Sequence, residues 1–357
     1  MLYINNMEFD YKKITQNILK ALPDRTREVI SRRFSLNKSG KPETLEAIGK
    51  SYNITRERVR QIENDGMKRA RKVLENAEIK DEFKKIRSYF EKKIEAAGGV
   101  KEEEKLLAEI SSIEQKDNIL FLLSLSDSLF KEKEDDDFNP FWALSKDMAS
   151  SAKKVAADSV KSLKEGGKPE SLESLHAIYK KSGGKISSEA FSSCLEISKD
   201  ILKTLDGEKV GLKSWPEVNP RTVKDKIKLI LKENEKPLHF KEIAEMISGL
   251  NETMAGRMTK NKKLHPQTVH NELIRNQDFV LVGRGYYALK DWGYNPGQVK
   301  DVIYQVISAS NGALPKDEIV SSVLKQRMVK ESTILLNLQN KNFFVRDGEG
   351  KYKVREA

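Results

Sequence analysis

The chain has 357 residues, 38% hydrophobic and 33% charged, which favours several small domains over one large core. Its single cysteine, Cys194, excludes internal disulfides and cysteine-based zinc sites; with no apolar run of membrane-spanning length and no secretory signal, the sequence predicts a cytoplasmic protein. The net charge of +11 is uneven, with +7 over residues 1–80, −6 over 81–150, +2 over 151–218 and +8 over 219–357, so both basic regions favour a polyanion such as nucleic acid.

Residues 22–74 predict three helices. The first spans roughly 24–34, and a polar loop follows it. Thr44 is a suitable N-cap for a short second helix, and Thr55 for a third helix that reaches residue 74. Between them lies a tight turn, where Asn53 tolerates a left-handed backbone.

The third of these helices has two distinct faces at 100° per residue. The packing face comprises Val59, Ile62, Gly66, Ala70 and Val73. The opposite face comprises Arg56, Glu57, Arg60, Gln61 and Asn64. Arg suits guanine, Gln suits adenine and Glu accepts from the cytosine amino group, so this face is typical of a DNA-reading helix. Arg58 lies toward the flank, where a phosphate contact is more natural.

Residues 22–34, 44–49 and 54–63 together resemble region four of the sigma-70 family, most specifically in the run Thr-Arg-Glu-Arg-Val-Arg-Gln-Ile-Glu that starts at Thr55. The resemblance implies reading of a minus-35-like promoter element in double-stranded DNA by Arg56, Glu57, Arg60 and Gln61. It implies contacts to the DNA backbone from Thr44, Leu45 and Arg58, with Arg25 and Arg33 in matching positions. It also implies docking on the flap of the RNA polymerase beta subunit.

The sequence departs from that family in two ways. Only 21 residues precede Leu22, so we expect a partial sigma-like protein without regions two and three rather than a full sigma factor. Asn64, Asp65 and Gly66 stand where the family usually has a basic residue near DNA. Asp65 is expected to weaken a phosphate contact, and Gly66 to lower helix stability.

A repeat of about 76 residues follows a charged helix predicted at 76–97. The strings Gly-Leu-Lys-Ser-Trp215 and Ala-Leu-Lys-Asp-Trp292 each precede an Asn-Pro pair and an amphipathic helix. In each copy a second helix is predicted near 240–249 or 316–325. A third helix is predicted to start near Pro266 or Ser332, and a terminal hairpin follows it. Three helices plus a hairpin is the outline of a winged helix.

Fainter copies end near residues 144 and 212. The fold class predicted is therefore mainly α, with an N-terminal helix-turn-helix followed by tandem winged-helix modules that carry small β-hairpin wings. The predicted domains are a helix-turn-helix at 1–76, a charged helix and winged helix at 77–150, and winged helices at 151–218, 219–294 and 295–357.

Residues 219–292 resemble the HARE-type winged helix, a module shared by the delta subunit of bacterial RNA polymerase, some restriction enzymes and some chromatin regulators. The likeness lies in 236–243, 265–273 and 279–289. It implies contact with DNA or with polymerase. Candidate DNA contacts in this module are Gln267, Thr268, Asn271 and Arg275 on the third helix and Arg284 at the hairpin tip.

The sequence indicates neither a catalytic site nor a metal site. The four histidines lack convincing metal-ligand spacing, and the acidic run 134–137 favours a solvated loop. We expect a non-enzymatic transcription regulator without cofactor, metal, membrane contact or small-molecule substrate. Two alternatives remain: a delta-like or flap-binding polymerase accessory protein that hardly reads DNA, and the DNA-targeting component of a restriction or modification system.

Overall fold

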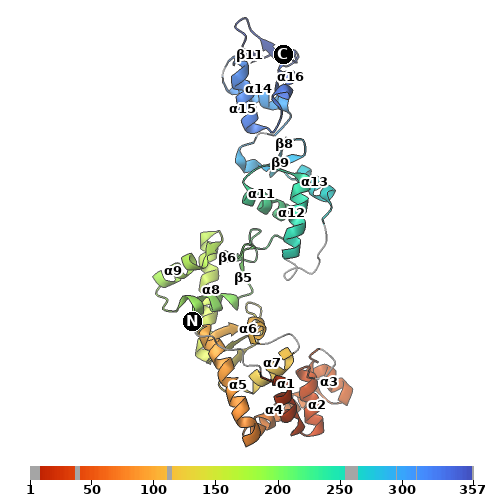
Figure 1. The fold of residues 1–357 in the computed structure, drawn as a ribbon, viewed down its shortest axis with the longest axis vertical. Coiled ribbons are helices and arrows are strands. Elements are labelled where there is room, and N and C mark those ends of the chain that lie inside the picture. Colours follow the sequence, from red (N-terminus) through yellow and green to blue (C-terminus); the bar gives the residue numbers. More distant parts are fainter. Residues whose placement is uncertain are drawn as a thin grey trace. The chain divides into compact units, whose positions relative to one another are not determined.

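The computed structural model describes residues 9–36, 41–110, 115–253, 264–294, 296–310 and 312–355. The chain divides into two compact units, residues 1–203 with 208–213, and residues 204–207 with 214–357. Helices dominate both, and the sheets are small, antiparallel and of two or three strands (Figure 1). The predicted mainly helical fold class with small hairpins is thereby confirmed. Within the described residues, no helix combines the length and apolar character of a membrane span.

Four helices open the first unit. They are α1 (Tyr11–Lys20), α2 (Asp24–Arg33), α3 (Leu45–Tyr52) and α4 (Arg56–Val73). The last three correspond to the predicted helices, whereas α1 was not predicted. Its signal was present, because Tyr11, Ile14 and Ile18 recur at helical spacing and are all buried. Asp10 also caps its first turn, accepting a hydrogen bond from the Lys13 amide at 2.9 Å.

The next part of the first unit has the order helix, strand, helix, helix, strand, strand. Its elements are α5 (Ala77–Ala96), β1 (Val100–Glu102), α6 (Glu103–Ile110), α7 (Lys116–Leu125), β2 (Phe130–Glu132) and β3 (Phe141–Ala143). The last strand lies in the middle of the sheet, in the order β1-β3-β2. This is winged-helix topology, and we call it the first winged module. The charged helix predicted at 76–97 is thus the module's own first helix.

The second winged module repeats this order within the same unit. Its elements are α8 (Lys146–Gly166), β4 (Glu170–Ser171), α9 (Leu172–Lys181), α10 (Ser188–Glu196), β5 (Ile201–Lys203) and β6 (Lys209–Leu212). The sheet order is again first, last, middle, as β4-β6-β5. The acidic run 134–137 lies in the loop between β2 and β3 and is exposed, as expected of a solvated loop. Asp135 accepts a hydrogen bond from Lys153 of α8 at 3.0 Å, and Glu134 lies 2.6 Å from Lys199, so two carboxylates of the run form ion pairs.

The second unit contains two more copies. The third winged module comprises α11 (Val223–Asn234), β7 (Leu238–His239), α12 (Phe240–Thr253), α13 (Pro266–Arg275), β8 (Phe279–Gly283) and β9 (Tyr286–Leu289), followed by the short 3-10 helix η2 (Lys290–Trp292). The fourth comprises α14 (Val299–Ala309), α15 (Lys316–Gln326), α16 (Glu331–Leu338), β10 (Phe344–Arg346) and β11 (Tyr352–Val354). In the fourth, a single bridge between Leu314 and Tyr352 stands where the other modules have a first strand. The helices and hairpins predicted here are confirmed.

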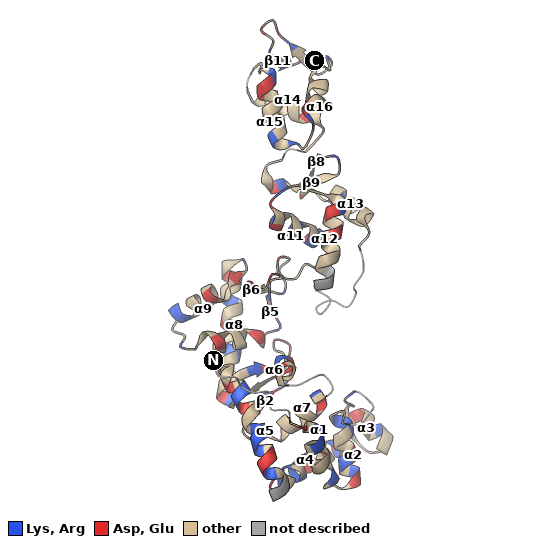
Figure 2. Cartoon of the chain, in the orientation of Figure 1, with Lys and Arg blue, Asp and Glu red and all other residues tan. Residues whose placement is uncertain are grey.

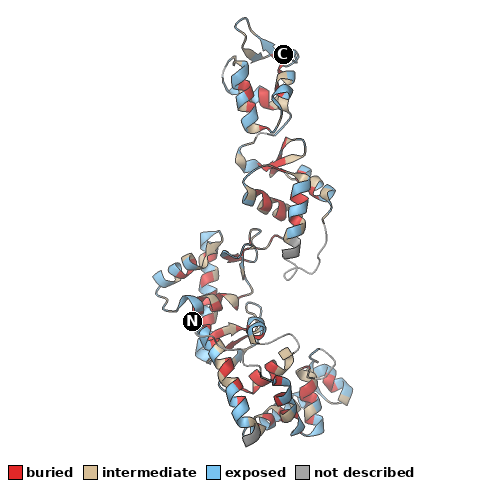
Figure 3. Cartoon of the chain, in the orientation of Figure 1, coloured by how far each residue is buried: buried red, intermediate tan, exposed pale blue. Residues whose placement is uncertain are grey.

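Buried residues lie mainly on the inward faces of the helices (Figure 3). In the first unit, one core joins the helix-turn-helix to the first winged module, since Ile30 of α2 and Ala70 of α4 share it with Phe90 of α5 and Phe121 of α7. The third and fourth modules have cores of their own. Trp292 packs against the core of the third module.

Candidate nucleic-acid interface

Local sequence signals set the geometry of the turn between α3 and α4. The Thr44 hydroxyl accepts a hydrogen bond from the Ala47 amide at 3.1 Å, and the Thr55 hydroxyl accepts one from the Arg58 amide at 3.2 Å. Both threonines therefore cap the helices as predicted. Asn53 ends α3 with φ 55° and ψ 43°, the left-handed conformation expected of it.

The two helices cross closely because a glycine lies at the contact. A Cβ placed on Gly49 of α3 would come within 2.8 Å of the Ile54 carbonyl oxygen, so a side chain there would force the turn open. Val29, Ile48 and Val59 form the small core beneath the turn. These contacts tie α2, α3 and α4 into one body and fix the angle at which α4 projects.

The close packing of α4 on α2 explains why a glycine stands at position 66, where the family usually differs. A Cβ on this residue would lie 2.7 Å from Thr26 Cγ2 and 3.1 Å from Ile30 Cγ1. Gly66 is buried, and it lets α4 pack directly on α2 at the cost of intrinsic helix propensity. Asp65, the other unusual residue, is exposed and pairs with Arg69 one turn later at 2.7 Å.

The N-terminal half of α4 presents the predicted reading face to solvent. Arg56, Glu57, Arg60, Gln61 and Asn64 are all exposed. Glu57 and Arg60 form a bidentate pair, with Nε and Nη2 of Arg60 at 2.8 and 2.7 Å from the carboxylate oxygens. The pair lowers the pKa of Glu57 and raises that of Arg60. Both groups are thus charged at neutral pH, and a DNA base edge would have to replace the pairing between them.

Arg58 and Gln61 also contact each other, since Arg58 Nη1 donates to Gln61 Oε1 at 3.0 Å. Arg58 is exposed on the flank of α4, as predicted for a contact with a phosphate. Thr44 is exposed and Leu45 is partly buried at the start of α3. A duplex lying along α4 would find these three residues beside the reading face.

Arg25 and Arg33, the matching positions of α2, lie in different surroundings. Arg25 is exposed, and its guanidinium lies 5.5 Å from the centre of the Tyr52 ring. Arg33 is partly buried, lies 3.2 Å from Glu63 of α4 and donates to the Glu43 carbonyl. Arg33 thus links α2 to α4 and to the segment before α3, a contact that spacing along one helix does not reveal. Its role in contacting DNA stays a prediction.

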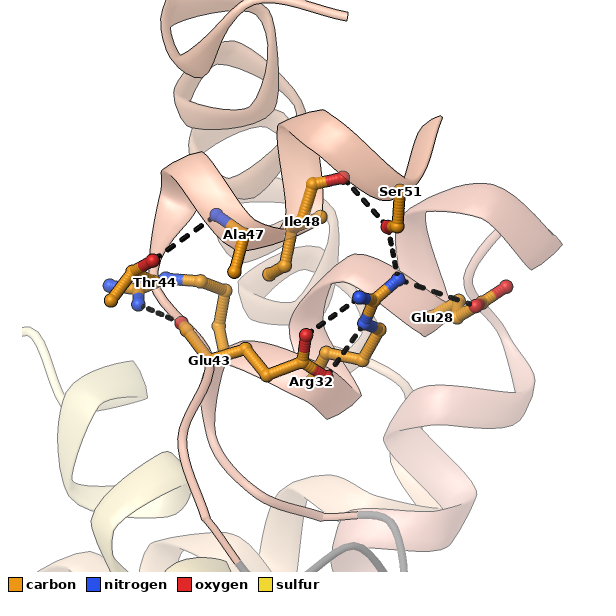
Figure 4. Close-up of polar contacts among 8 residues, drawn as sticks. Glu28, Arg32, Glu43, Thr44, Ala47, Ile48 and Ser51 are labelled. Carbon is orange, nitrogen blue, oxygen red and sulfur yellow. Dashed lines mark hydrogen bonds and ion pairs between the residues drawn. The ribbon is translucent and has the colours of Figure 1, made fainter. Parts of the chain in front are cut away.

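Arg32 also contacts the segment before α3, and it was not among the site residues predicted from the sequence. Its guanidinium donates to both carboxylate oxygens of Glu43, at 2.8 and 2.6 Å, and to the Ser51 hydroxyl at 2.8 Å (Figure 4). The hydrogen bonds to Glu43 raise the pKa of Arg32 and lower that of Glu43. This network positions Thr44 and therefore the start of α3.

The rear of α4 is covered by the first winged module. Arg71 donates to the Ser124 carbonyl of α7 at 3.1 Å and lies 2.9 Å from the Asp127 carboxylate. Phe34 meets the edge of the Phe121 ring with centroids 5.3 Å apart. No residue of α7 is exposed, so the helix that reads DNA in many winged helices is here packed inside the first unit, where it contacts α4. Lys and Arg alternate with acidic residues on the exposed parts of α4 and α5 (Figure 2).

The third helix of the second module, α10, is also covered, in this case by residues of the first module. Ala190 of α10 abuts Gly98, where any Cβ would overlap it, and Gly98 has a left-handed φ of 81°. By contrast, the candidate contacts of the third module are open. Gln267, Thr268, Asn271 and Arg275 on α13 and Arg284 in the β8–β9 turn are exposed, and Gln267 donates to Asn271 at 3.0 Å.

Three of the four histidines lie in the third module, and His176 lies on α9 of the second, where it stacks on Phe191. His265 caps α13, since its Nδ1 accepts a hydrogen bond from the Gln267 amide at 3.2 Å. His270 stacks on Phe240 with centroids 4.4 Å apart. Within the part of the chain that the structure describes, no three metal-ligating side chains of the His, Cys, Asp or Glu type come together.

These features define a helix-turn-helix with an exposed, charged second helix, attached to winged modules. Residues 18–72 match the family model described as Sigma-70, region 4. The sequence is 45% identical over 65 residues to the RNA polymerase sigma factor RpoD of Helicobacter pylori, which covers 18% of this chain and 10% of that protein. It is 39% identical over 66 residues to the sigma factor SigA of Microcystis aeruginosa, covering 18% of this chain and 16% of that protein. The chain thus matches only about a tenth to a sixth of these relatives.

Proposed function

We propose that this protein is a DNA-binding transcription regulator that reads a promoter element of the minus-35 type through α4. The observation that carries the proposal is the exposed face formed by Arg56, Glu57, Arg60 and Gln61, within a segment similar to sigma-70 region 4. That face is supported from behind by the core of Val29, Ile48 and Val59, which fixes the N-terminal half of α4 on α2 and α3. A pre-organised reading helix loses little conformational freedom when it enters the major groove.

In this mechanism, the side chains divide between base reading and positioning. Arg56 and Arg60 pair with guanine edges, Gln61 with adenine, and Glu57 accepts from a cytosine amino group. Arg58, Thr44 and Leu45 contact the DNA backbone, and so do Arg25 and Arg33 on the rim. The protein acts by binding and positioning, without a catalytic step, and phosphate contacts make its affinity strongly dependent on salt.

We further propose that the protein contacts RNA polymerase at the flap of the beta subunit, as the likeness to sigma factors implies. The third winged module would then be of the HARE type and would add DNA contacts through Gln267, Thr268, Asn271, Arg275 and Arg284. What supports this is its winged topology and the exposure of those residues. An accessory role at polymerase with little sequence reading is the second candidate, favoured by the burial of α7 and α10 in internal contacts.

The test is selection of bound sequences from a randomised duplex pool by the purified full chain, at two salt concentrations. The expected result is enrichment of a minus-35-like hexamer that disappears with Arg56→Ala or Gln61→Ala. Arg69→Ala is the matched control, because Arg69 is exposed on the same helix about 20 Å beyond Arg56 and about 12 Å beyond Gln61, at about 1.5 Å per residue.

Two outcomes would contradict sequence reading. One is binding without enrichment, and the other is equal loss of affinity in the Arg69 variant. If the Arg56→Ala variant still co-purifies with RNA polymerase, the accessory role at polymerase is then favoured. Loss of both activities in a variant that keeps its helical circular dichroism would show that one surface serves both partners.

A further inference from the structure

A cleft of about 1010 Å³ lies inside the second unit, between the wing of the third module and the fourth module. Its wall on one side is the β8–β9 wing, including Leu281, Arg284 and Tyr286. On the other side it is the segment joining α15 to α16, including Met328 and Lys330. The two modules that bound it belong to the same compact unit.

Polar contacts beside the cleft join the two modules. The Met328 amide donates to the Val282 carbonyl at 2.7 Å, and the buried Arg327 guanidinium donates to the carbonyls of Leu281 and Gly297. A Cβ on Gly283 would lie 2.7 Å from the Met328 carbonyl oxygen, so the wing and the joining segment approach as closely as glycine allows. The carbonyls of Leu281 and Val282 are therefore engaged and do not serve to add a further strand there.

The surface of the cleft combines exposed apolar side chains with positive charge. Leu281 is 47% exposed and Met328 is 50% exposed, both high for side chains of this type. Arg284, Arg327 and Lys330 line it, and no Asp or Glu is among the described residues that line it. The nearby Asp301 carboxylate is committed to the N-terminus of α14, where it accepts from the Gln298 amide at 2.6 Å.

We propose that this cleft binds an acidic, amphipathic segment of a partner protein. Apolar side chains of such a segment would cover Leu281 and Met328, and its carboxylates would meet Arg284 and Lys330 at the rim. An apolar centre with a charged rim is the usual anatomy of protein interfaces. A DNA backbone would gain from the cations but would leave the exposed apolar side chains without a partner, so protein is favoured over DNA. Arg284 would then contact this segment in place of the DNA contact proposed for it above, whereas the DNA contacts proposed on α13 are unaffected. This inference does not depend on α4 reading DNA.

The test uses the full chain and a fluorescent 12-residue peptide in which Glu and Asp alternate with Leu and Phe. Its probes for comparison are the same peptide with Gln and Asn in place of the acids, and a 12-base-pair duplex. We expect saturable binding of the acidic peptide, about tenfold weaker binding with Met328→Asp and about fivefold weaker binding with Arg284→Glu or Lys330→Glu. Lys241→Glu, an equal charge change at an exposed residue of α12 outside the cleft, should leave binding unchanged.

The exposed charge variants keep the test decisive even if Met328→Asp proves unstable. The proposal is overturned if the acidic peptide shows no saturable binding, if the Gln and Asn peptide binds equally well, or if Lys241→Glu weakens binding as much as Arg284→Glu. It is also overturned if the cleft variants lower affinity for the duplex while leaving the peptide unaffected. In that case the cleft is a DNA-backbone contact.

Discussion

The substitution Gly66→Ala separates helix propensity from packing in α4. Alanine stabilises a helix interior by about 1 kcal/mol relative to glycine, so propensity alone predicts a more stable α4. The new methyl group, however, would lie 2.7 Å from Thr26 Cγ2 and 3.1 Å from Ile30 Cγ1. Both neighbours are buried, and Ile30 is fully enclosed. Overpacking of this kind costs about 1–3 kcal/mol, so we expect net destabilisation of about 1 kcal/mol.

Hydrogen exchange followed by mass spectrometry on peptides from α2 and α4 measures this effect locally. A loss of about 1 kcal/mol corresponds to about fivefold faster exchange where local opening governs the rate. The control is Asn64→Ala, an exposed position two residues earlier, which gains helix propensity without meeting α2 and should exchange at the same rate or more slowly. Slower exchange in Gly66→Ala would refute the packing argument, because it would mean that α2 yields to the methyl group without cost.

The other predictions concern a helix cap, the salt dependence of binding and an ion pair in the third module. Thr55→Ala removes the side-chain acceptor of the first turn of α4 and should destabilise that turn by about 1 kcal/mol, seen as faster exchange there, while Thr55→Ser should not. Arg58→Ala should lower the slope of log affinity against log salt by about one, equally for all duplexes; a sequence-dependent loss would instead assign Arg58 to base reading. Asp278 interacts with Lys224 and with Lys228, the latter at 2.9 Å, and hydrogen bonds from them lower its pKa to about 2. Its contribution to stability is therefore present above the unfolded pKa near 3.8 and is lost as pH falls toward 2, so urea midpoints of Asp278→Asn and wild type should differ at pH 5 and converge near pH 2. A gap that persists at pH 2 would contradict this origin.

The helices of the reading motif were predictable because their signals are local. Thr44, Asn53 and Thr55 mark helix ends through hydrogen bonds and backbone conformations that span only a few residues. The burial of Val59 and Ala70 follows from their spacing along one helix. The repeat near Trp215 and Trp292 similarly predicted the hairpins and helices of the second unit.

Other features depend on residues distant in the sequence. Arg33 meets Glu63 across 30 positions, and Arg71 meets Ser124 across 53. The local sequence around either arginine does not distinguish a side chain that forms contacts with another helix from one that is available to bind a phosphate. Helix α1 differs from these arginines, since its apolar spacing and its Asp10 cap were present in the sequence, and only the core that it joins lies in distant residues.

The sequence by itself determined where the three helices of the reading motif begin and end, which face of α4 is charged and that winged units repeat. These properties follow from capping, periodicity and turn chemistry, all of which act over one or two turns of chain. Only the tertiary structure decided that α7 braces α4, that Gly66 serves close packing and that a cationic, apolar cleft lies beside the third wing. Such features arise when surfaces from separate segments are packed together, and their energies depend on shapes that a linear pattern does not contain.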